Sequence, residues 1–221
     1  MEQMEIEYKS MSSQVANYIK KQILSGKYEE GDHLVEKKIA KNLGVSRAPV
    51  RDAMRILTNK GLVESIPHKG HFVVGFSESE IKEIFEIRLF LEKQVLDDIF
   101  KNDLLDESDY DYIKKIAEEM MQIAKSDNYT DYKEQLLELN NKDVQLHKYL
   151  WGKSNKAYSV KFLKEIHDHL RLAMIIDSQL KNSLEKTAKQ HLDLAKAIIE
   201  NDIAKTYEIL EEHVYSLSKK S

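Results

Sequence analysis

The distribution of glycine and proline along the chain limits the possible folds more than any other feature. Both prolines and six of the seven glycines lie before residue 77, and only Gly152 interrupts the 144 residues that follow. Because these two residue types end or bend regular elements, the first third is predicted to consist of short elements joined by turns. Apolar residues recur at helical spacing through the rest, which predicts an all-helical bundle.

A boundary between two domains is expected after residue 76. Ser77 is followed three residues later by Glu80, which is the spacing of a capping box that opens a helix. We therefore expect one domain over residues 1–76 and another over residues 77–221. Apolar spacing in the second domain predicts six helices, over roughly 78–101, 107–126, 130–152, 155–181, 184–200 and 202–218.

The first domain is expected to contain three helices and a hairpin. The helices should end at Gly26, Gly44 and Lys60, Ser46 should cap the third of them, and β-forming runs cover residues 62–66 and 71–76. Two helices joined by a tight turn and followed by a hairpin form a winged helix-turn-helix. The predicted fold class is therefore mainly α, with an N-terminal winged helix-turn-helix and a C-terminal all-α helical bundle.

Composition excludes several classes of protein. Apolar residues make up 42% of the chain and charged residues 33%, and no apolar run approaches the roughly 20 residues of a membrane span. The N-terminus is acidic and polar where a signal peptide is basic and then apolar, so we expect a cytoplasmic protein with no membrane association. The absence of cysteine excludes disulfides, thiolate zinc sites and cysteine nucleophiles.

The net charge of −4 is unevenly divided between the two domains. Residues 1–77 carry a net charge of +3 and residues 78–221 carry −7, so a polyanion such as DNA would prefer the first domain. The third predicted helix carries a stripe of arginines, Arg47, Arg51 and Arg55, at spacing i, i+4, i+8. For an isolated triplet the ordinary interpretation is a solvated cationic face, but this one lies on the second helix of a helix-turn-helix.

The start of that helix is predicted to read DNA bases. Arginine can pair with guanine through two hydrogen bonds, and residues near the N-terminus of a recognition helix reach base edges, so Arg47 and Arg51 are the expected base-reading residues. Contacts to the DNA backbone are expected from Arg55, Lys37, His68 and Lys69. Gly70 would let the tip of the wing turn tightly.

The run GDHLVEKKIAKNLGVSRAPVRDAMRILTNKGLVESIPHKGHFVV resembles the winged-helix signature of GntR-type regulators, most closely the FadR subfamily. The resemblance spans about residues 10–76 and is most specific in LGVSRAPVRDAMRIL followed by KGLVE. It implies that Arg47 and Arg51 contact DNA and that Gly70 is the wing glycine. The chain departs from the signature at Glu30, where proline is usual, and at Lys37, where arginine is common. Lys37 can neutralise a phosphate but loses bidentate recognition.

Four residues of the second domain have the chemistry of metal ligands. Asp143 and His147 lie four apart and so project from one face of a predicted helix, while His191 and His213 lie on the apolar stripes of the last two helices. Nitrogen and carboxylate ligands without thiolate suit zinc, nickel, manganese or iron(II). Spacing alone favours the ordinary interpretation of buried histidines satisfied by hydrogen bonds, because only the Asp143/His147 pair has a fixed geometry.

The segment from Arg88 to His213 is similar to the FCD ligand-binding domain of FadR-type regulators. The metal pattern of that domain is an Asp and a His four apart, followed by a histidine on each of the last two helices. This pattern is matched by Asp143, His147, His191 and His213. The resemblance therefore implies a divalent metal, with zinc as the first candidate. Six helices also resemble the shorter VanR-like form of this domain.

Arg88 lies on the apolar stripe of its predicted helix and requires a partner there. Glu92, at i+4, would provide an internal ion pair. The alternative partner is the carboxylate of an effector, since members of the resembling family commonly sense small organic acids. Arg171 and His167 are weaker candidates for the same effector pocket.

The function expected from these features is that of a homodimeric, sequence-specific transcription regulator that is not an enzyme. It should act as a repressor at a two-fold symmetric operator, with its affinity controlled by a small carboxylate bound near a divalent metal. A metal-dependent hydrolase with an appended DNA-binding domain is one alternative, although the sequence shows no motif for its general base. A DNA-binding regulator with a purely structural helical domain is the other.

Overall fold

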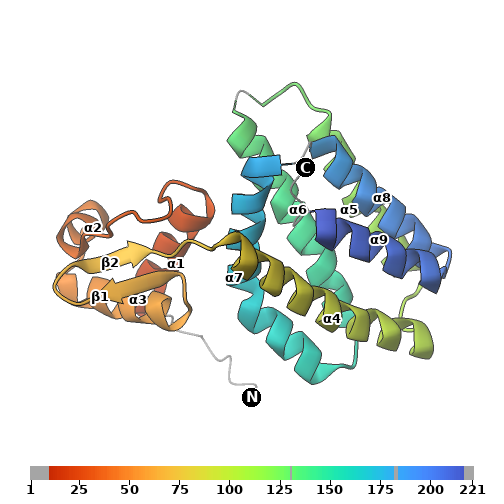
Figure 1. Cartoon of the computed structure of the whole chain (residues 1–221), viewed down its shortest axis with the longest axis horizontal. Coiled ribbons are helices and arrows are strands. Elements are labelled where there is room, and N and C mark those ends of the chain that lie inside the picture. Colours follow the sequence, from red (N-terminus) through yellow and green to blue (C-terminus); the bar gives the residue numbers. More distant parts are fainter. Residues whose placement is uncertain (1–9, 130, 182–183, 217–221) are drawn as a thin grey trace, which may run out of the picture. The chain divides into compact units, whose positions relative to one another are not determined.

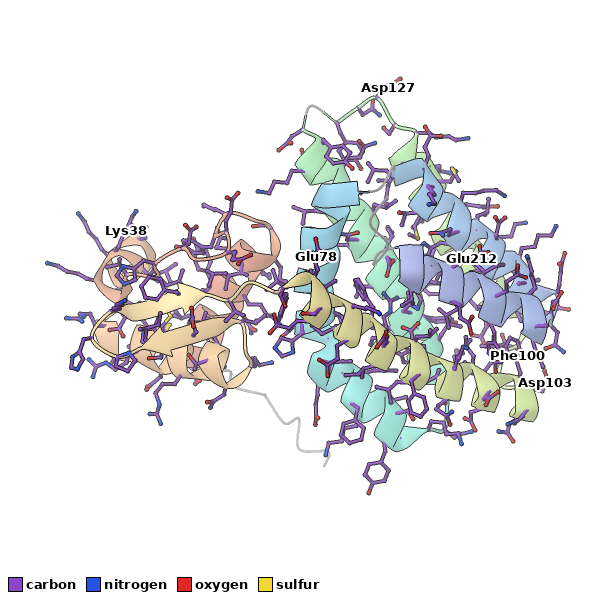
Figure 2. All side chains as sticks on the ribbon, viewed as in Figure 1. Lys38, Glu78, Phe100, Asp103, Asp127 and Glu212 are labelled. Carbon is purple, nitrogen blue, oxygen red and sulfur yellow. The ribbon has the colours of Figure 1, made fainter. Side chains whose placement is uncertain are left out.

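The computed structural model describes residues 10–129, 131–181 and 184–216, and the chain divides into two compact units, Met1–Gly75 and Phe76–Ser221 (Figure 1). Among the described residues, no helix has the length and apolar character needed to cross a lipid bilayer. Figure 2 shows charged side chains such as Lys38 and Glu212 pointing outward from their helices, where both are exposed. Each unit has its own core.

The N-terminal unit is a winged helix-turn-helix. Its elements are α1 (Met11–Leu24), α2 (Glu36–Leu43), α3 (Arg47–Asn59), β1 (Val63–Ile66) and β2 (Gly70–Val73). The strands pair antiparallel with Val63 opposite Val73 and Ile66 opposite Gly70. Helices α1 and α2 both pack on α3, whose apolar stripe is buried. The predicted mainly α fold with a small wing is therefore confirmed.

Two local expectations for this unit are wrong. Ser46 occupies the N-cap position of α3, but its side chain makes no capping hydrogen bond. The second strand was expected to reach Phe76, yet β2 ends at Val73. Beyond the paired residues the amide of Val74 still donates to the carbonyl of Leu62 at 3.1 Å, so the hairpin ends within one residue of the last strand pair.

Within the described residues the C-terminal unit has six helices, as apolar spacing predicts. They are α4 (Glu78–Asn102), α5 (Glu107–Ala124), α6 (Tyr132–Lys153), α7 (Ala157–Lys181), α8 (Leu184–Ile199) and α9 (Ile203–Ser216). Residues 130, 217 and 218 of the expected helices lie outside the described residues. The observed ends otherwise differ from the expected ones by at most two positions.

The helices of this unit enclose a single apolar core. Helix α4 packs on α7 and α9, and α5 packs on α6 and α8. Fully buried side chains, such as Phe85 on α4, Ile113 on α5 and Leu146 on α6, fill the space between them. Burial of the apolar stripes is the main force that holds the bundle together. Among the described residues, eleven polar side chains of this unit are buried, and six of them gather at one place.

Candidate functional site

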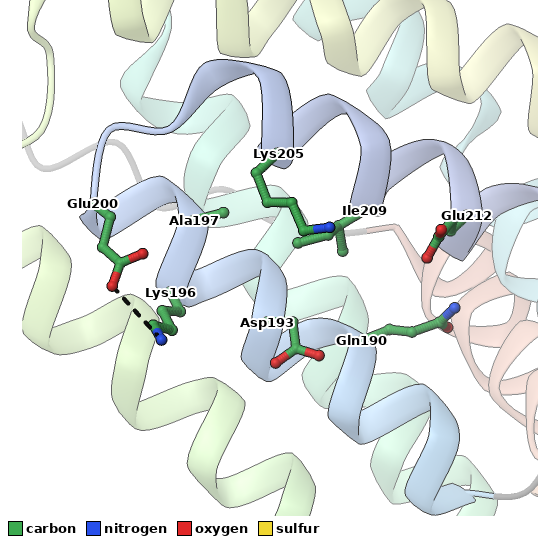
Figure 3. Close-up of a pocket in the computed structure, with 8 residues that line it drawn as sticks. All are labelled: Gln190, Asp193, Lys196, Ala197, Glu200, Lys205, Ile209 and Glu212. Atoms are coloured by element: carbon green, nitrogen blue, oxygen red, sulfur yellow. Dashed lines mark ion pairs between the residues drawn. The ribbon is translucent and has the colours of Figure 1, made fainter.

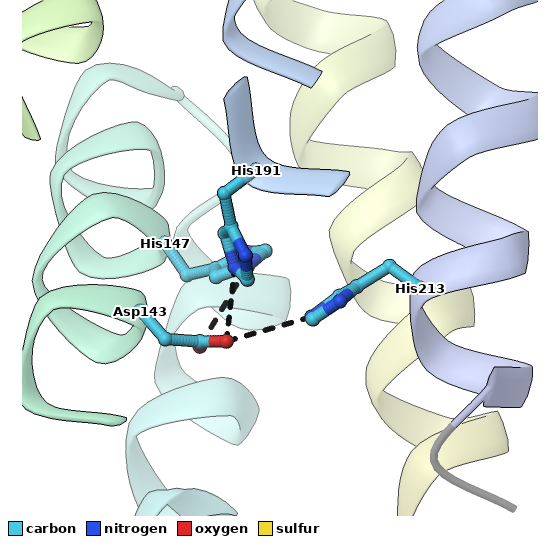
Figure 4. A group of neighbouring side chains, drawn as sticks. All are labelled: Asp143, His147, His191 and His213. Carbon is cyan, nitrogen blue, oxygen red and sulfur yellow. Dashed lines mark ion pairs between the residues drawn. The ribbon is translucent and has the colours of Figure 1, made fainter. Parts of the chain in front are cut away.

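Three histidines and an aspartate converge in the interior of the helical unit (Figure 4). Asp143 and His147 come from α6, His191 from α8 and His213 from α9. All four side chains are buried, and one ligand atom from each lies within 4.8 Å of the others. The Oδ2 atom of Asp143 lies 2.9 Å from Nε2 of His191 and 3.5 Å from Nε2 of His213. The structure thus brings together all four ligands predicted from the sequence.

Two of the imidazole rings are held from behind by oxygen atoms. Nδ1 of His147 lies 2.9 Å from Oε2 of Glu92 in an ion-pair contact, and Nδ1 of His191 is hydrogen-bonded to the carbonyl oxygen of Thr187 at 2.8 Å. Such contacts fix the tautomer and ring orientation of metal-binding histidines. They leave the Nε2 atom of each ring free to face the cluster.

The inward-facing atoms of the cluster fit a bound cation. Buried polar atoms normally have hydrogen-bond partners, but Nε2 of His147, Nε2 of His191 and both oxygens of Asp143 make no hydrogen bond of normal geometry within the described residues. A divalent transition metal coordinated by the two imidazole nitrogens and one oxygen of Asp143 would satisfy those atoms. Three imidazole nitrogens and one carboxylate oxygen form a donor set that suits zinc, nickel, manganese or iron(II).

The surroundings of Asp143 and His213 keep these two side chains in the protonation states that a metal requires. Burial raises the pKa of Asp143, but the neighbouring His191 and Arg88 outweigh burial and hold this pKa well below its ordinary value. Burial and the neighbouring His191 lower the pKa of His213 to about 3. Asp143 is therefore a carboxylate, and His213 a neutral imidazole, at any ordinary pH, as metal ligands must be.

Arg88 lies beside the cluster and is itself buried. Its Nε atom donates to Oε1 of Glu92 at 3.2 Å, and its Nη2 atom lies 3.5 Å from Oδ1 of Asp143. Burial would raise the pKa of Glu92, but Arg88 and His147 lower it to about 2. The internal ion pair offered by the sequence is thus present. An effector carboxylate at Arg88 would share the guanidinium group with two protein carboxylates.

A small cavity adjoins the cluster on the side of His147 and Trp151. Its volume is about 10 Å³, which is room for about one water molecule. Its lining consists of Glu92, Val95, Leu96, His147, Leu150, Trp151, Leu194 and Leu210. A carboxylate larger than this cavity can enter only if lining side chains move.

His167 and Arg171 on α7 have unmet hydrogen-bonding capacity. Nε2 of His167 and Nε of Arg171 are buried and make no hydrogen bond within the described residues, although Nη2 of Arg171 donates to Asn141 at 2.6 Å. Burial lowers the pKa of both side chains. The His167 ring lies 6.4 Å from the ring of Trp151, which also lines the small cavity.

A larger groove of about 400 Å³ lies between α8 and α9 (Figure 3). It contains none of the residues predicted to bind a ligand. Its lining carries charges of both signs, including Lys196, which pairs with Glu200 at 3.7 Å, and Lys205, which pairs with Glu208 at 2.9 Å. We interpret it as an ordinary solvated surface.

The predicted DNA-binding residues all lie in the N-terminal unit. The side chains of Arg47, Arg51 and Arg55 are 62%, 63% and 78% exposed on α3, whereas Val50 and Met54 on the opposite face of the helix are buried. One face of this helix therefore packs while the other presents three guanidinium groups. Sequence reasoning missed Glu36 of α2, which lies beside Arg47 although the two are eleven positions apart.

The remaining predicted contacts lie on α2 and at the tip of the wing. Lys37, His68 and Lys69 are exposed. His68 and Gly70 have φ values of 61° and 110°, both in the left-handed region. Glycine adopts such values without strain, so Gly70 permits the turn expected there.

Both units of the chain match known protein families. The chain matches the bacterial regulatory proteins of the gntR family over residues 11–73 and the FCD domain over residues 83–216. The HTH-type transcriptional regulator YdhC of Bacillus subtilis is 25% identical over 201 residues, which cover 91% of this chain and 84% of that protein. The gluconate operon transcriptional repressor of Bacillus subtilis is 37% identical over 95 residues, which cover 43% of this chain and 39% of the repressor.

Solved structures share the fold of the chain. McbR/YncC of E. coli aligns with a TM-score of 0.72 at 22% identity and covers 93% of this chain and 94% of its own. A GntR transcriptional regulator from Rhodococcus sp. RHA1 aligns with a TM-score of 0.74 at 19% identity, covering 94% and 95%. The FCD match alone spans more than half of the chain, and the gntR match spans the winged helix. The chain therefore belongs to the GntR family of bacterial transcription regulators, in the FadR-like subfamily whose members carry an FCD domain.

Proposed function

We propose that this DNA-binding regulator is a homodimeric repressor that holds a divalent transition metal, zinc first, at Asp143, His147, His191 and His213. Binding of a small carboxylate beside the metal would release the repressor from its two-fold symmetric operator. The observation that carries the proposal is the buried cluster of four ligand side chains in a chain that also has a winged helix. Family membership makes the chain a regulator rather than an enzyme, so the hydrolase alternative is set aside.

Metal reconstitution tests the central part of this proposal. Trp151 is buried, and its Nε1 atom donates to Glu92, which in turn contacts His147. Adding zinc to chelator-treated protein should therefore change the tryptophan fluorescence, and metal should raise the unfolding temperature by mass action. We expect one metal per chain by elemental analysis.

Replacement of a ligand provides the control for that experiment. His191→Ala removes a ligand and should abolish both responses, whereas His169→Ala removes a histidine outside the cluster and should preserve them. A wild-type protein that takes up no metal and shows no thermal shift would contradict the metal site. It would favour the alternative in which the helical unit is purely structural.

Two features support a carboxylate effector. Arg88 places a buried guanidinium group beside Asp143, and the buried Nε atom of Arg171 makes no hydrogen bond within the described residues. A carboxylate can accept hydrogen bonds from such donors, and a cation makes its burial less costly. Because the adjoining cavity has room for about one water, effector entry requires movement of the lining side chains.

The dimer is proposed to form through the exposed apolar face of α4 and α7. These helices pack on each other and expose four large apolar side chains: Ile87, Phe90, Tyr158 and Phe162. Charged pairs on the same helices, Lys82 with Glu86 and Lys161 with Glu165, provide the polar rim that is typical of an interface. A second copy is the proposed occupant because each chain has one recognition helix, and a two-fold operator needs two.

A further inference from the structure

Glu36 is a carboxylate placed between the recognition helix and the wing. Its Oε2 atom lies 3.4 Å from Nη2 of Arg47 and 4.0 Å from Nε of Arg51, and its Oε1 atom lies 3.9 Å from Nδ1 of His71 on β2. Its side chain is 16% exposed, whereas those of Arg47 and Arg51 are 62% and 63% exposed. One nearly covered carboxylate therefore contacts both arginines of the predicted reading surface.

The contacts leave most of each guanidinium group available. Glu36 engages Nη2 of Arg47 and approaches Nε of Arg51, while each guanidinium has five N–H donors in a planar fork. Donors remain on both side chains for the O6 and N7 atoms of guanine. An ion pair whose arginines are this exposed contributes little to folding stability, so its main physical effect is to restrict the rotamers of the two arginines.

The charge and the position of Glu36 act differently on different DNA sequences. Its negative charge opposes the approach of phosphates equally on every sequence, since phosphate contacts carry no base information. Restricting the arginine rotamers lowers the entropy lost on binding, but only where the bases match the arrangement that is held. Together the two effects weaken non-operator binding more than operator binding.

We propose that Glu36 is a positioning residue for base specificity, which holds Arg47 and Arg51 for base reading and lowers the affinity for other DNA. This inference rests on the proposed role of those arginines at the operator. It assigns a part in sequence discrimination to a residue of α2 that need not touch a base. His71 extends the same contact to β2, so the wing strand also helps to hold the carboxylate in place.

The ratio of operator to non-operator affinity tests the inference. The full-length protein would be titrated against its preferred site, selected from random duplexes, and against a scrambled duplex, at several salt concentrations. In Glu36→Gln we expect the affinity for the scrambled duplex to rise and the ratio to fall about 3- to 10-fold, the range expected for ordering a long side chain on binding. Glu36→Asp retains the charge but shortens the side chain. The ratio of operator to non-operator affinity should therefore fall, while the affinity for the scrambled duplex should not rise.

Asp52→Asn provides a matched change of charge on the recognition helix itself. Asp52 is 58% exposed on α3, and its carboxylate lies 4.0 Å from Arg55, which is assigned to the DNA backbone. Here both affinities should rise together and leave the ratio unchanged. If Glu36→Gln behaves like Asp52→Asn, Glu36 acts through charge alone and the inference is wrong. A parallel fall in both affinities with a lower unfolding temperature would also overturn it.

Arg51→Ala separates this inference from the proposed function. Loss of one bidentate base contact should relax the base preference by about 5- to 150-fold. If Arg51→Ala leaves the preference unchanged, the assignment of α3 as the reading helix fails. If Arg51→Ala relaxes the preference and Glu36→Gln does not, only the role of Glu36 fails.

Discussion

At the scale of single residues, Glu92 links the parts of the helical unit that matter for ligand binding. Its Oε2 atom lies 2.9 Å from Nδ1 of His147, and its Oε1 atom accepts hydrogen bonds from Arg88 and Trp151, each at 3.2 Å. All four side chains are buried. A change at the metal cluster can therefore reach the buried arginine and the tryptophan through one carboxylate.

Glu92→Gln should weaken metal binding about 10- to 100-fold, the usual effect of removing a partner that orients a metal-binding histidine. Gln keeps the size of the side chain but loses the charge that orients His147. Competition for zinc with a chromophoric chelator would measure the affinity. Glu86→Gln makes the same change at an exposed position of α4 and should leave the affinity unaltered. An unchanged affinity in folded Glu92→Gln, as judged by circular dichroism, would contradict the positioning role.

At the scale of elements, the first turn of α4 determines where the helical unit begins. The Oγ atom of Ser77 accepts from the amide of Glu80 at 3.3 Å, and the Glu80 carboxylate accepts from the amide of Ser77 at 2.8 Å. These bonds satisfy amides that a helix leaves without partners at its start. The Ser77 hydroxyl also donates to the Glu80 carboxylate at 2.6 Å, and this bond, with that from the Ser77 amide, lowers the pKa of Glu80. The helix that carries Arg88 and Glu92 is thus fixed at its N-terminus.

Ser77→Ala should destabilise the protein by about 1 kcal/mol, since it removes an N-cap hydrogen bond. Ser46→Ala is the matched control, because Ser46 occupies the N-cap position of α3 but makes no capping bond through its side chain. Chemical denaturation followed by circular dichroism would compare the two variants. Equal losses in free energy of unfolding would show that the capping box of α4 contributes nothing specific.

At the scale of the whole molecule, self-association is expected to depend on the apolar face of α4 and α7. Phe90 is 65% exposed there, and Phe90→Glu should place a buried charge in the proposed interface and shift the protein to monomer. Ile203→Glu puts the same charge at an exposed apolar position of α9 and should leave the dimer intact. Sedimentation velocity distinguishes the outcomes. A dimer that persists in Phe90→Glu would place the interface elsewhere.

The coupling between effector and operator is also a property of the whole molecule. A typical allosteric coupling of about 1 to 3 kcal/mol would change operator affinity by about 5- to 150-fold, and linkage requires operator DNA to change effector affinity by the same factor. Calorimetric titration of small organic acids into the metal-loaded protein, with and without operator, measures both. Equal effector affinities in the two titrations would mean that the bound acid does not control DNA binding.

Local sequence patterns determined the elements of this protein. Apolar periodicity predicted the six helices of the second unit, and the arginine spacing predicted the exposed stripe of α3, because side-chain direction along a helix follows from its 3.6-residue repeat. The Ser77/Glu80 capping box is equally local and was predicted correctly. Ser46 was not, because the sequence alone does not reveal whether a serine at an N-cap forms its hydrogen bond.

Tertiary structure decided which of these elements meet. Spacing fixed only the Asp143/His147 pair, and the likeness to a known family supplied the other two ligands. The contacts of Glu92 with His147 and of Glu36 with Arg47 join residues on different helices, whose faces meet only after the helices pack. The rotation and crossing of packed helices depend on how whole apolar surfaces fit together, and no short stretch of sequence carries that information.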